Sequence, residues 1–392
     1  MIKIDIDEST RNNIAEHHWT WMKKRFGIDN PKSCEKAKKR KRELYKLLSI
    51  KKDKEFEELI KADFTKLDEL AKKNEWAAFT QVSSSDRDEY KKLKDEIVDI
   101  KKQLKNDPKS QKLKEKLKQK ESDLSKYEII RKGNEIFSYL GYNDFRDDGE
   151  IKKKGEKKSD ESWGGYDYCL ALNLKVCPYC NREYINTVDR IKLDNETELK
   201  GVRPDFDHFF PKSKYPFLSC SIFNLIPACK FCNQLKSDKY SDGRLIYPFE
   251  EEFGEQGRFE IDFDTGIDIK TLNMEKDINL KLNSSNDLSS SSLARNKIKK
   301  ELIDNSNKAF RLIDIYNTHQ DQIKEFIKRI RSLCGSGEKT YQSFDNELLE
   351  LYKKQSGSAK EYAKKILLGL PTDNQEYPLR KMKNDILEQI GI

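Results

Sequence analysis

Hydrophobic residues recur at helical spacing over most of the first 142 residues. Segments 34–49 and 55–73 carry an apolar residue every three or four positions among dense charges, which is the pattern of amphipathic helices. From residue 90 to 104 the spacing becomes a strict alternation of three and four, and such a heptad seam favours helix-on-helix packing. The seam consists of Tyr90, Leu93, Ile97, Ile100 and Leu104.

A second apolar stripe follows a break at residues 106–108, which include a proline. It consists of Leu113, Leu117, Leu124 and Tyr127. The two stripes predict an antiparallel helical hairpin over about residues 88–127. A seam this narrow, with this much charge around it, would protrude. Either it docks against a partner, or it is a solvated arm that touches nothing.

The second half of the chain mixes periodicities. Residues 151–162 are basic and polar and are predicted to be a linker. Residues 259–263 and 267–269 alternate around a turn at 264–266, which predicts a hairpin, and residues 278–282 suggest a third strand. A polar loop is expected at 283–292. From Leu293 the helical period returns, breaks at 335–337 and resumes to Ile392.

Composition excludes two classes of protein. Of the 392 residues, 37% are charged, and no run approaches the roughly 18 apolar residues of a membrane-spanning helix, so we expect no membrane partner. The 10% aromatic content argues against a disordered chain. A net charge of +8 suits a polyanionic partner.

Cysteine usage points to metal rather than to disulfides. The Met1 end has no basic stretch followed by an apolar core, so we expect no signal peptide and a cytoplasmic location. In a reducing compartment the eight cysteines favour metal binding. Two C-x-x-C pairs, Cys177 with Cys180 and Cys229 with Cys232, are predicted to share one structural Zn²⁺. Coincidental burial of four thiols is the weaker alternative, because two well-formed pairs occur in a chain this poor in cysteine.

Three histidines and the four cysteines outside the C-x-x-C pairs are not predicted to take part in catalysis. His17 and His18 lie beside Trp19 and Trp21 and are expected to be packing residues. His319 is expected to be structural. The remaining cysteines are expected to be ordinary thiols, and Cys169 is the best spare candidate for a metal ligand.

Polar residues between and beside the cysteine pairs suggest a reaction. Asp207 and His208 end a predicted strand at 202–210, Asn224 follows, and Asn233 comes directly after Cys232. A hard cation needs oxygen ligands such as a carboxylate and an amide carbonyl, and a neutral imidazole can deprotonate a water. This set matches what metal-assisted hydrolysis of a phosphodiester requires.

The phrases that hold these residues resemble a known nuclease motif. "CPYC", "DFDHFFPKSKYPF" and "FNLIPACKFCNQLKSDK", within residues 176–240, are similar to the HNH, or ββα-metal, endonuclease motif in its zinc-bound four-cysteine form. The resemblance implies that His208 is the general base and that Asp207 and Asn233 hold Mg²⁺ or Mn²⁺. It also implies that Asn224 fixes the loop and orients His208. Many zinc-bound members have histidine where this chain has Asn233.

The resemblance also implies an orientation for nucleic acid. The helix that begins near Asn233 would lie along the phosphate backbone, and nearby lysines would contact phosphates without reading sequence. These lysines are Lys212, Lys214, Lys230 and Lys236.

Two sequence segments outside the motif resemble HNH proteins of antiphage defence systems. "LIDIYNTHQDQ" and "YPLRKMKNDILEQI" are similar to HNH proteins of Septu-type and retron-associated systems, which accompany an ATPase. The implied partner is therefore an ATPase encoded nearby.

Together these observations predict an α+β protein in three parts. Residues 1–150 form a helical domain with the hairpin, 163–250 a zinc-stabilised HNH module, and 251–392 a β-hairpin followed by helices. The expected activity is metal-dependent endonuclease action on DNA, as the effector of a bacterial antiphage system. The alternatives are a zinc-knuckle binding or adaptor protein without activity, and an RNA-cleaving HNH toxin.

Overall fold

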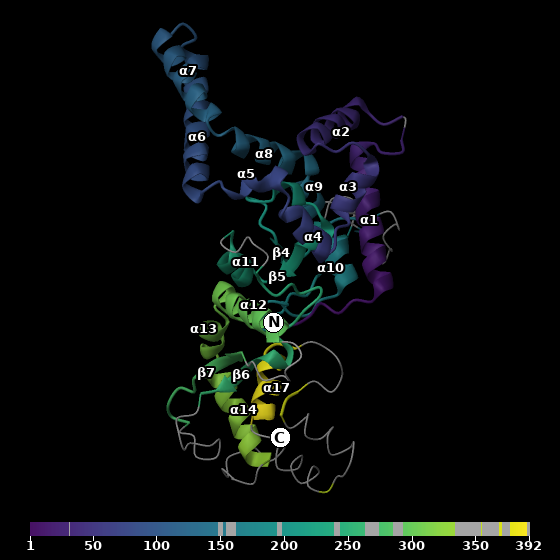
Figure 1. The fold of residues 1–392 in the computed structure, drawn as a ribbon, viewed down its shortest axis with the longest axis vertical. Helices are drawn as coiled ribbons and strands as arrows, with labels where there is room; N and C mark the ends of the chain where they lie inside the picture. The colour runs from purple at the N-terminus through teal and green to yellow at the C-terminus, as the bar shows by residue number, and fades with distance from the viewer. Residues whose placement is uncertain are drawn as a thin grey trace.

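The computed structural model describes residues 1–30, 32–147, 152–153, 162–193, 198–238, 244–262, 274–284, 293–333, 354, 368–370 and 377–389. Helices dominate, and the described strands form three small sheets (Figure 1). The expectation of mixed helices and strands is confirmed at this level. None of the described helices has the length and apolar character needed to cross a bilayer.

The region up to residue 147 is helical, as the periodicity predicts. Its main helices are α1 (Glu8–Phe26), α2 (Glu35–Leu48), α3 (Asp53–Ile60), α4 (Phe64–Ala71), α5 (Ala77–Thr80), α6 (Ser84–Asn106), α7 (Gln111–Ser125), α8 (Glu128–Leu140) and α9 (Tyr142–Asp147). Local chemistry sets their ends. Asp7 accepts a hydrogen bond from the Thr10 backbone at the start of α1, and Ser83 and Asp86 form a capping box on α6. Gly27 and Gly141 end α1 and α8 in the left-handed conformation, which glycine adopts without strain.

Helices α6 and α7 form the predicted hairpin, which projects from the body of the molecule (Figure 1); it is called the arm below. The α6 seam is buried at Tyr90, Leu93, Ile97 and Ile100, and α7 is the element that covers it. Ion pairs join the two helices from Lys101 to Glu121 at 2.8 Å and from Lys120 to Glu96 at 2.6 Å. The seam therefore packs inside the arm, between α6 and α7. A partner that bound the arm would contact the charged outer faces of these helices.

The centre of the fold is a two-stranded sheet followed by a short helix. Strand β4 (Asp205–His208) pairs antiparallel with β5 (Leu225–Ala228), so that Asp205 lies opposite Ala228 and His208 opposite Leu225. Helix α11 (Lys230–Lys236) begins directly after β5. The intervening loop contains two single-turn helices, η2 (Pro216–Leu218) and η3 (Ile222–Asn224), and α10 (Gly165–Leu172) precedes the first cysteine pair.

The predicted linker contains a short strand. Within 151–162, Lys152–Lys153 form strand β1, which pairs in parallel with β2 (Ile191–Lys192), and β2 pairs with β3 (Glu198–Leu199). Most of the other linker positions lie outside the described residues.

The C-terminal sheet pairs two of the three predicted strands. Strand β6 (Gly257–Ile261) pairs antiparallel with β7 (Leu280–Ser284), which covers the predicted third strand and takes in the first two positions of the predicted 283–292 loop. The predicted partner strand at 267–269 lies outside the described residues, as do the rest of that loop and the break at 335–337. The described helices at this end of the molecule are α12 (Leu293–Phe310), α13 (Leu312–Asn317), α14 (Gln320–Leu333) and α17 (Arg380–Gln389).

His18 joins the N-terminal helices to the central region, as expected of a packing residue. Its side chain is fully buried. The Trp163 indole N–H donates to His18 Nδ1 at 3.2 Å, and Nε2 lies 2.8 Å from the Cys220 carbonyl oxygen. Because a carbonyl only accepts, Nε2 carries the proton and the ring is neutral. Burial lowers the pKa of His18 to about 4, although the hydrogen bond to the Cys220 carbonyl acts in the opposite direction.

This burial predicts an acid-sensitive fold. Below the ordinary pKa of 6.5 the unfolded chain protonates His18 while the folded chain does not, until the pH reaches about 4. Stability therefore falls as the pH falls through this window. At about 1.4 kcal/mol per pH unit, the loss is roughly 3 kcal/mol. Urea unfolding at several pH values should show that His18→Gln removes this part of the pH dependence.

The neighbouring histidine supplies the control. His17 is exposed and stacks on Trp163 with ring centroids 5.2 Å apart. His17→Gln should retain the parent's pH dependence. Equal slopes for the parent and His18→Gln would show that His18 does not stay neutral in the fold.

Candidate metal centre and adjoining pocket

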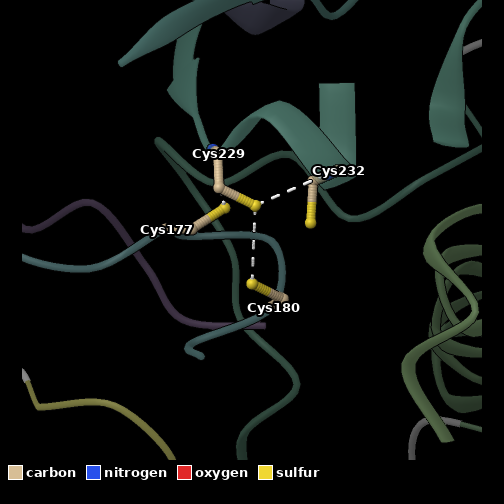
Figure 2. A group of neighbouring side chains, drawn as sticks. All are labelled: Cys177, Cys180, Cys229 and Cys232. Carbon is tan, nitrogen blue, oxygen red and sulfur yellow. Dashed lines mark hydrogen bonds between the residues drawn. The ribbon is translucent and has the colours of Figure 1, made fainter. Parts of the chain in front are cut away.

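Four cysteines converge at the centre of the molecule. Their sulfur atoms all lie within 4.8 Å of one another, and all four residues are buried (Figure 2). Cys177 and Cys180 lie on a tight turn that Asn181 closes with a positive φ of 48°. Cys229 caps the N-terminus of α11, and Cys232 lies in its first turn. These residues are called the cysteine cluster.

The cysteine cluster has the donor set of a structural zinc site. Four sulfur ligands around one centre match the closed tetrahedral coordination that Zn²⁺ adopts with thiolates. The Sγ atoms of Cys180 and Cys229 are 3.9 Å apart. Burial raises the pKa of Cys177, whereas hydrogen bonds from Cys177, Cys229 and Cys232 lower the pKa of Cys180. A bound cation would replace the remaining thiol protons. The predicted four-cysteine site is thus brought together, and Cys169 is not part of it.

The first cysteine turn is also a packing centre. The Tyr316 hydroxyl donates to the Cys180 carbonyl at 2.6 Å, and the Leu379 backbone N–H donates to the Asn181 carbonyl at 2.6 Å. The rings of Tyr179 and Phe310 stack with centroids 4.3 Å apart. The C-terminal helices are therefore anchored on the turn that carries half of the cysteine cluster.

A buried carboxylate links the cysteine cluster to β4. Asp207 Oδ2 accepts a hydrogen bond from the Tyr179 hydroxyl at 2.7 Å, and Oδ1 accepts one from Lys236 Nζ at 3.0 Å. Lys236 also donates to the His208 carbonyl at 2.7 Å. The side chains of Lys236 and Asp207 are 0% and 4% exposed. Tyr179 lies between the first two cysteines and Lys236 lies one helical turn after Cys232, so the network joins both pairs.

His208 ends β4 in a largely buried position. It is 7% exposed, its ring centroid lies 4.6 Å from that of Tyr142, and Nε2 lies 3.1 Å from the Ser219 carbonyl oxygen. Because that carbonyl accepts, Nε2 carries the proton and Nδ1 keeps its lone pair. Burial is the main cause that lowers the pKa of His208 to about 3, and the positive charge of Lys212 lowers it further. The hydrogen bond to the Ser219 carbonyl acts in the opposite direction. The imidazole is therefore neutral at physiological pH.

Asn224 holds the loop between the two central strands. Its side-chain oxygen accepts from the Phe210 backbone N–H at 2.8 Å, and its amide nitrogen donates to the carbonyls of Phe210 and Leu218 at 3.1 and 3.0 Å. Ser219, which holds His208, follows Leu218 directly. Asn224 thus fixes the loop, and any influence on His208 passes through that loop.

A pocket of about 450 Å³ opens beside these residues; it is called the site pocket. Asp205, Asp207, His208 and Asn233 line it together, and Tyr142, Arg146, Arg203 and Lys212 complete much of its wall. The Asn233 amide nitrogen donates to Asp205 Oδ2 at 3.4 Å, so Asn233 contacts the carboxylate of the exposed Asp205. Asp205 and Asp207 are two residues apart on one strand and share a face, a signal that the sequence analysis missed. Nothing local in the sequence marked Arg146, because it comes from α9.

The four lysines expected to contact phosphate have different surroundings. Lys212 and Lys230 are exposed and Lys214 is half-buried. Lys212 Nζ lies 4.9 Å from the ring centroid of Phe137 and 5.1 Å from that of Tyr142. Lys236 does not reach the surface, because its ammonium group is held by Asp207 and the His208 carbonyl. In this arrangement Lys236 is a structural residue and not a phosphate contact.

Comparisons of the chain with protein-family models, with curated proteins and with solved structures found no match in any of the three.

The cysteine cluster predicts about one zinc ion per chain. Cys180→Ser should lower the zinc content and the unfolding temperature together, because three thiolates hold the ion less tightly than four. Metal analysis of the purified protein by mass spectrometry checks the first point, and a thermal melt checks the second. Cys34→Ser, at an exposed thiol, is the matched control. Well-folded protein purified without chelator and free of zinc would contradict the prediction.

The buried pair of Asp207 and Lys236 predicts a large stability effect. Lys236→Met leaves the Asp207 carboxylate buried without its cation, which typically costs about 3–5 kcal/mol. Lys230→Met, on the exposed side of the same helix, should cost much less. The double variant Asp207→Asn with Lys236→Met should recover part of the loss, since no buried charge remains. Urea unfolding of the parent, Lys230→Met, Asp207→Asn, Lys236→Met and the double variant tests this, and additive effects of the two single changes would show that the side chains are not coupled.

Proposed function

We propose that this chain is a metal-dependent endonuclease of the HNH type that hydrolyses phosphodiester bonds. The observation that supports the proposal is the site pocket, where a neutral imidazole lies among three carboxylates (Asp205, Asp207 and Asp238), an amide and several cations. The order of elements also fits the ββα arrangement. His208 ends the first strand, Asn224 directly precedes the second, and Asn233 lies on the helix that follows.

In this proposal His208 is the general base. Its Nε2–H is held by the Ser219 carbonyl, so Nδ1 is the nitrogen able to take a proton from a water. Arg146, Arg203 and Lys212 would hold the substrate phosphate at the same pocket. Asn224 keeps the loop that carries Ser219 in place.

The residues of the site pocket suit a hard cation. Asp205, Asp207 and Asn233 offer carboxylate and amide oxygens, the ligands that Mg²⁺ and Mn²⁺ prefer. Asp205 is exposed, whereas both oxygens of Asp207 are hydrogen-bonded, so Asp205 and Asn233 are the more accessible ligands. Such a cation supplies charge stabilisation for the leaving oxygen. The zinc of the cysteine cluster is a separate, structural ion.

The choice of DNA, the defence role and an ATPase partner complete the proposal. These three elements rest on the resemblance of the flanking phrases to antiphage HNH proteins. A binding or adaptor module without activity is the second candidate, and the low exposure of His208 is the observation that favours it. The cleavage assay described below uses both DNA and RNA as substrates, so it distinguishes DNA cleavage from RNA cleavage.

His208→Gln should lower the rate of cleavage roughly 10²- to 10⁴-fold, the usual contribution of a general base. Glutamine fills most of the buried site but cannot take up the proton. Zinc content should be unchanged. The measurement is cleavage of plasmid DNA and of structured RNA by the zinc-loaded chain with Mg²⁺ or Mn²⁺.

Two controls accompany this test. His17→Gln should cleave at the parental rate. EDTA should stop cleavage before it removes zinc, because four thiolates hold zinc more tightly than a few oxygens hold Mg²⁺. If the folded parent cleaves neither nucleic acid with either metal, alone or with a neighbouring ATPase, the binding module becomes the better description.

A further inference from the structure

A second cavity adjoins the site pocket at the base of the arm; it is called the arm cavity. It measures about 450 Å³ and is lined mainly by residues from the first half of α6 and from α8. This volume falls within the roughly 300–1,000 Å³ of small-ligand sites. The proposed reaction assigns no role to it.

The wall of the arm cavity combines apolar surface with positive charge. Phe79, Ile129 and Phe137 contribute apolar surface, while Arg87, Lys91 and Lys94 contribute cations. Among the described residues that line it, none is acidic. Lys91 and Lys94 are exposed. Arg87 is partly engaged, since it donates to the Ser213 carbonyl at 2.8 Å and lies 3.9 Å from Asp238. A ligand that satisfies this wall has a flat apolar part and at least one negative group.

Two residues connect the cavities. Lys212 and Ser213 line both the arm cavity and the site pocket. The Lys212 ammonium lies over Phe137, which belongs to the arm cavity, and over Tyr142, which belongs to the site pocket. A phosphate next to Lys212 would therefore have the proposed reaction centre on one side and an aromatic, cationic cavity on the other.

We infer that the arm cavity binds an unpaired nucleotide of the substrate strand, next to the phosphate that is cleaved. The base would pack on the apolar wall near Phe137, and Lys91 and Lys94 would contact the adjoining phosphates. Bases within a duplex are stacked inside and cannot enter such a cavity unless they are flipped out. The chain is accordingly selective for nucleic acid with single-stranded character. The inference rests on the proposed function and narrows its substrate class.

The test measures binding, so it does not depend on cleavage. The zinc-loaded full chain, without added Mg²⁺ or Mn²⁺, is titrated into labelled oligo(dT) of about 12 nucleotides, a length suited to single-strand sites, and into a duplex of equal length. Fluorescence anisotropy is recorded from about 50 to 200 mM salt. The parent should bind the single strand more tightly than the duplex.

Two variants test two different interactions in the cavity, base stacking and phosphate contact. Phe137→Ala should weaken single-strand binding roughly 5- to 150-fold, the range for loss of one base–aromatic stack. Lys91→Gln with Lys94→Gln should reduce the salt slope of log affinity by about 1.4, since each phosphate contact to a single strand contributes about 0.7. The lysines are exposed, so this variant keeps the inference testable even if Phe137→Ala fails to fold. Lys92→Gln, an exposed neighbour on α6 that does not line the cavity, should leave the slope unchanged.

Three outcomes overturn the inference: duplex bound at least as tightly as the single strand, a lysine pair variant with the slope of Lys92→Gln, or dTMP binding as tightly as the oligonucleotide. The last would make the arm cavity a site for a free nucleotide. Each leaves the proposed nuclease activity to be judged by the cleavage assay. Conversely, single-strand binding that depends on the cavity in a chain that cleaves nothing would overturn the nuclease and retain the nucleotide site.

Discussion

The burial of one carboxylate, that of Asp207, constrains the centre of this molecule. An isolated carboxylate is far too costly to remove from water, so its position requires partners that are buried with it. Lys236 supplies the charge and Tyr179 a hydroxyl hydrogen bond, and both partners come from the segments that carry the cysteine pairs. The geometry of the cysteine cluster and that of β4 are thus coupled. A shift of the segment that carries Lys236 would leave a buried charge unpaired, and a shift of the segment that carries Tyr179 would remove a buried hydrogen bond.

This coupling extends to the C-terminal part of the chain. The turn that holds Cys177 and Cys180 accepts hydrogen bonds from Tyr316 and from the backbone of Leu379. A buried hydrogen bond stabilises only modestly by itself, but an unpaired buried carbonyl costs about 1–3 kcal/mol. A metal that orders the turn would therefore also order the surface on which α13 and α17 pack. The main hydrophobic core contains residues from Met1 to Leu387 and includes all four cysteines, whereas the buried seam of the arm lies outside it. A metal held by the cysteines would therefore lie inside this core.

Sequence alone predicted the features that depend on local spacing. The spacing of residues along the sequence is enough to predict the cysteine pairs, the helical seam of the arm and the strand that ends at His208. Features set by tertiary burial could not be predicted in this way. Lys236 looks like one more cation on a basic helix, and only the position of Asp207 shows that it is buried. The pairing of β6 with β7 was missed because a more local partner was available in the pattern, and Arg146 joins the site pocket from a helix far away in sequence. Asp205 is a different case, since alternation along β4 would have placed it beside Asp207.

The electrostatics of the site pocket give the proposed base a dependence on substrate. After burial, the positive charge of Lys212 is the largest influence that holds the pKa of His208 near 3. A base with so low a pKa is neutral but weak, which at first favours the inactive alternative. A phosphate bound at Lys212 would offset that positive charge, and a nearby negative charge favours the protonated imidazole. The pKa of His208 would then move towards the range in which general bases work well. The same lysine borders the arm cavity. A nucleic acid strand bound across both cavities would therefore raise the pKa of His208 only if one of its phosphates lies next to Lys212. In the proposed reaction, the cations that would bind the substrate phosphate would also keep His208 a weak base until that phosphate is bound.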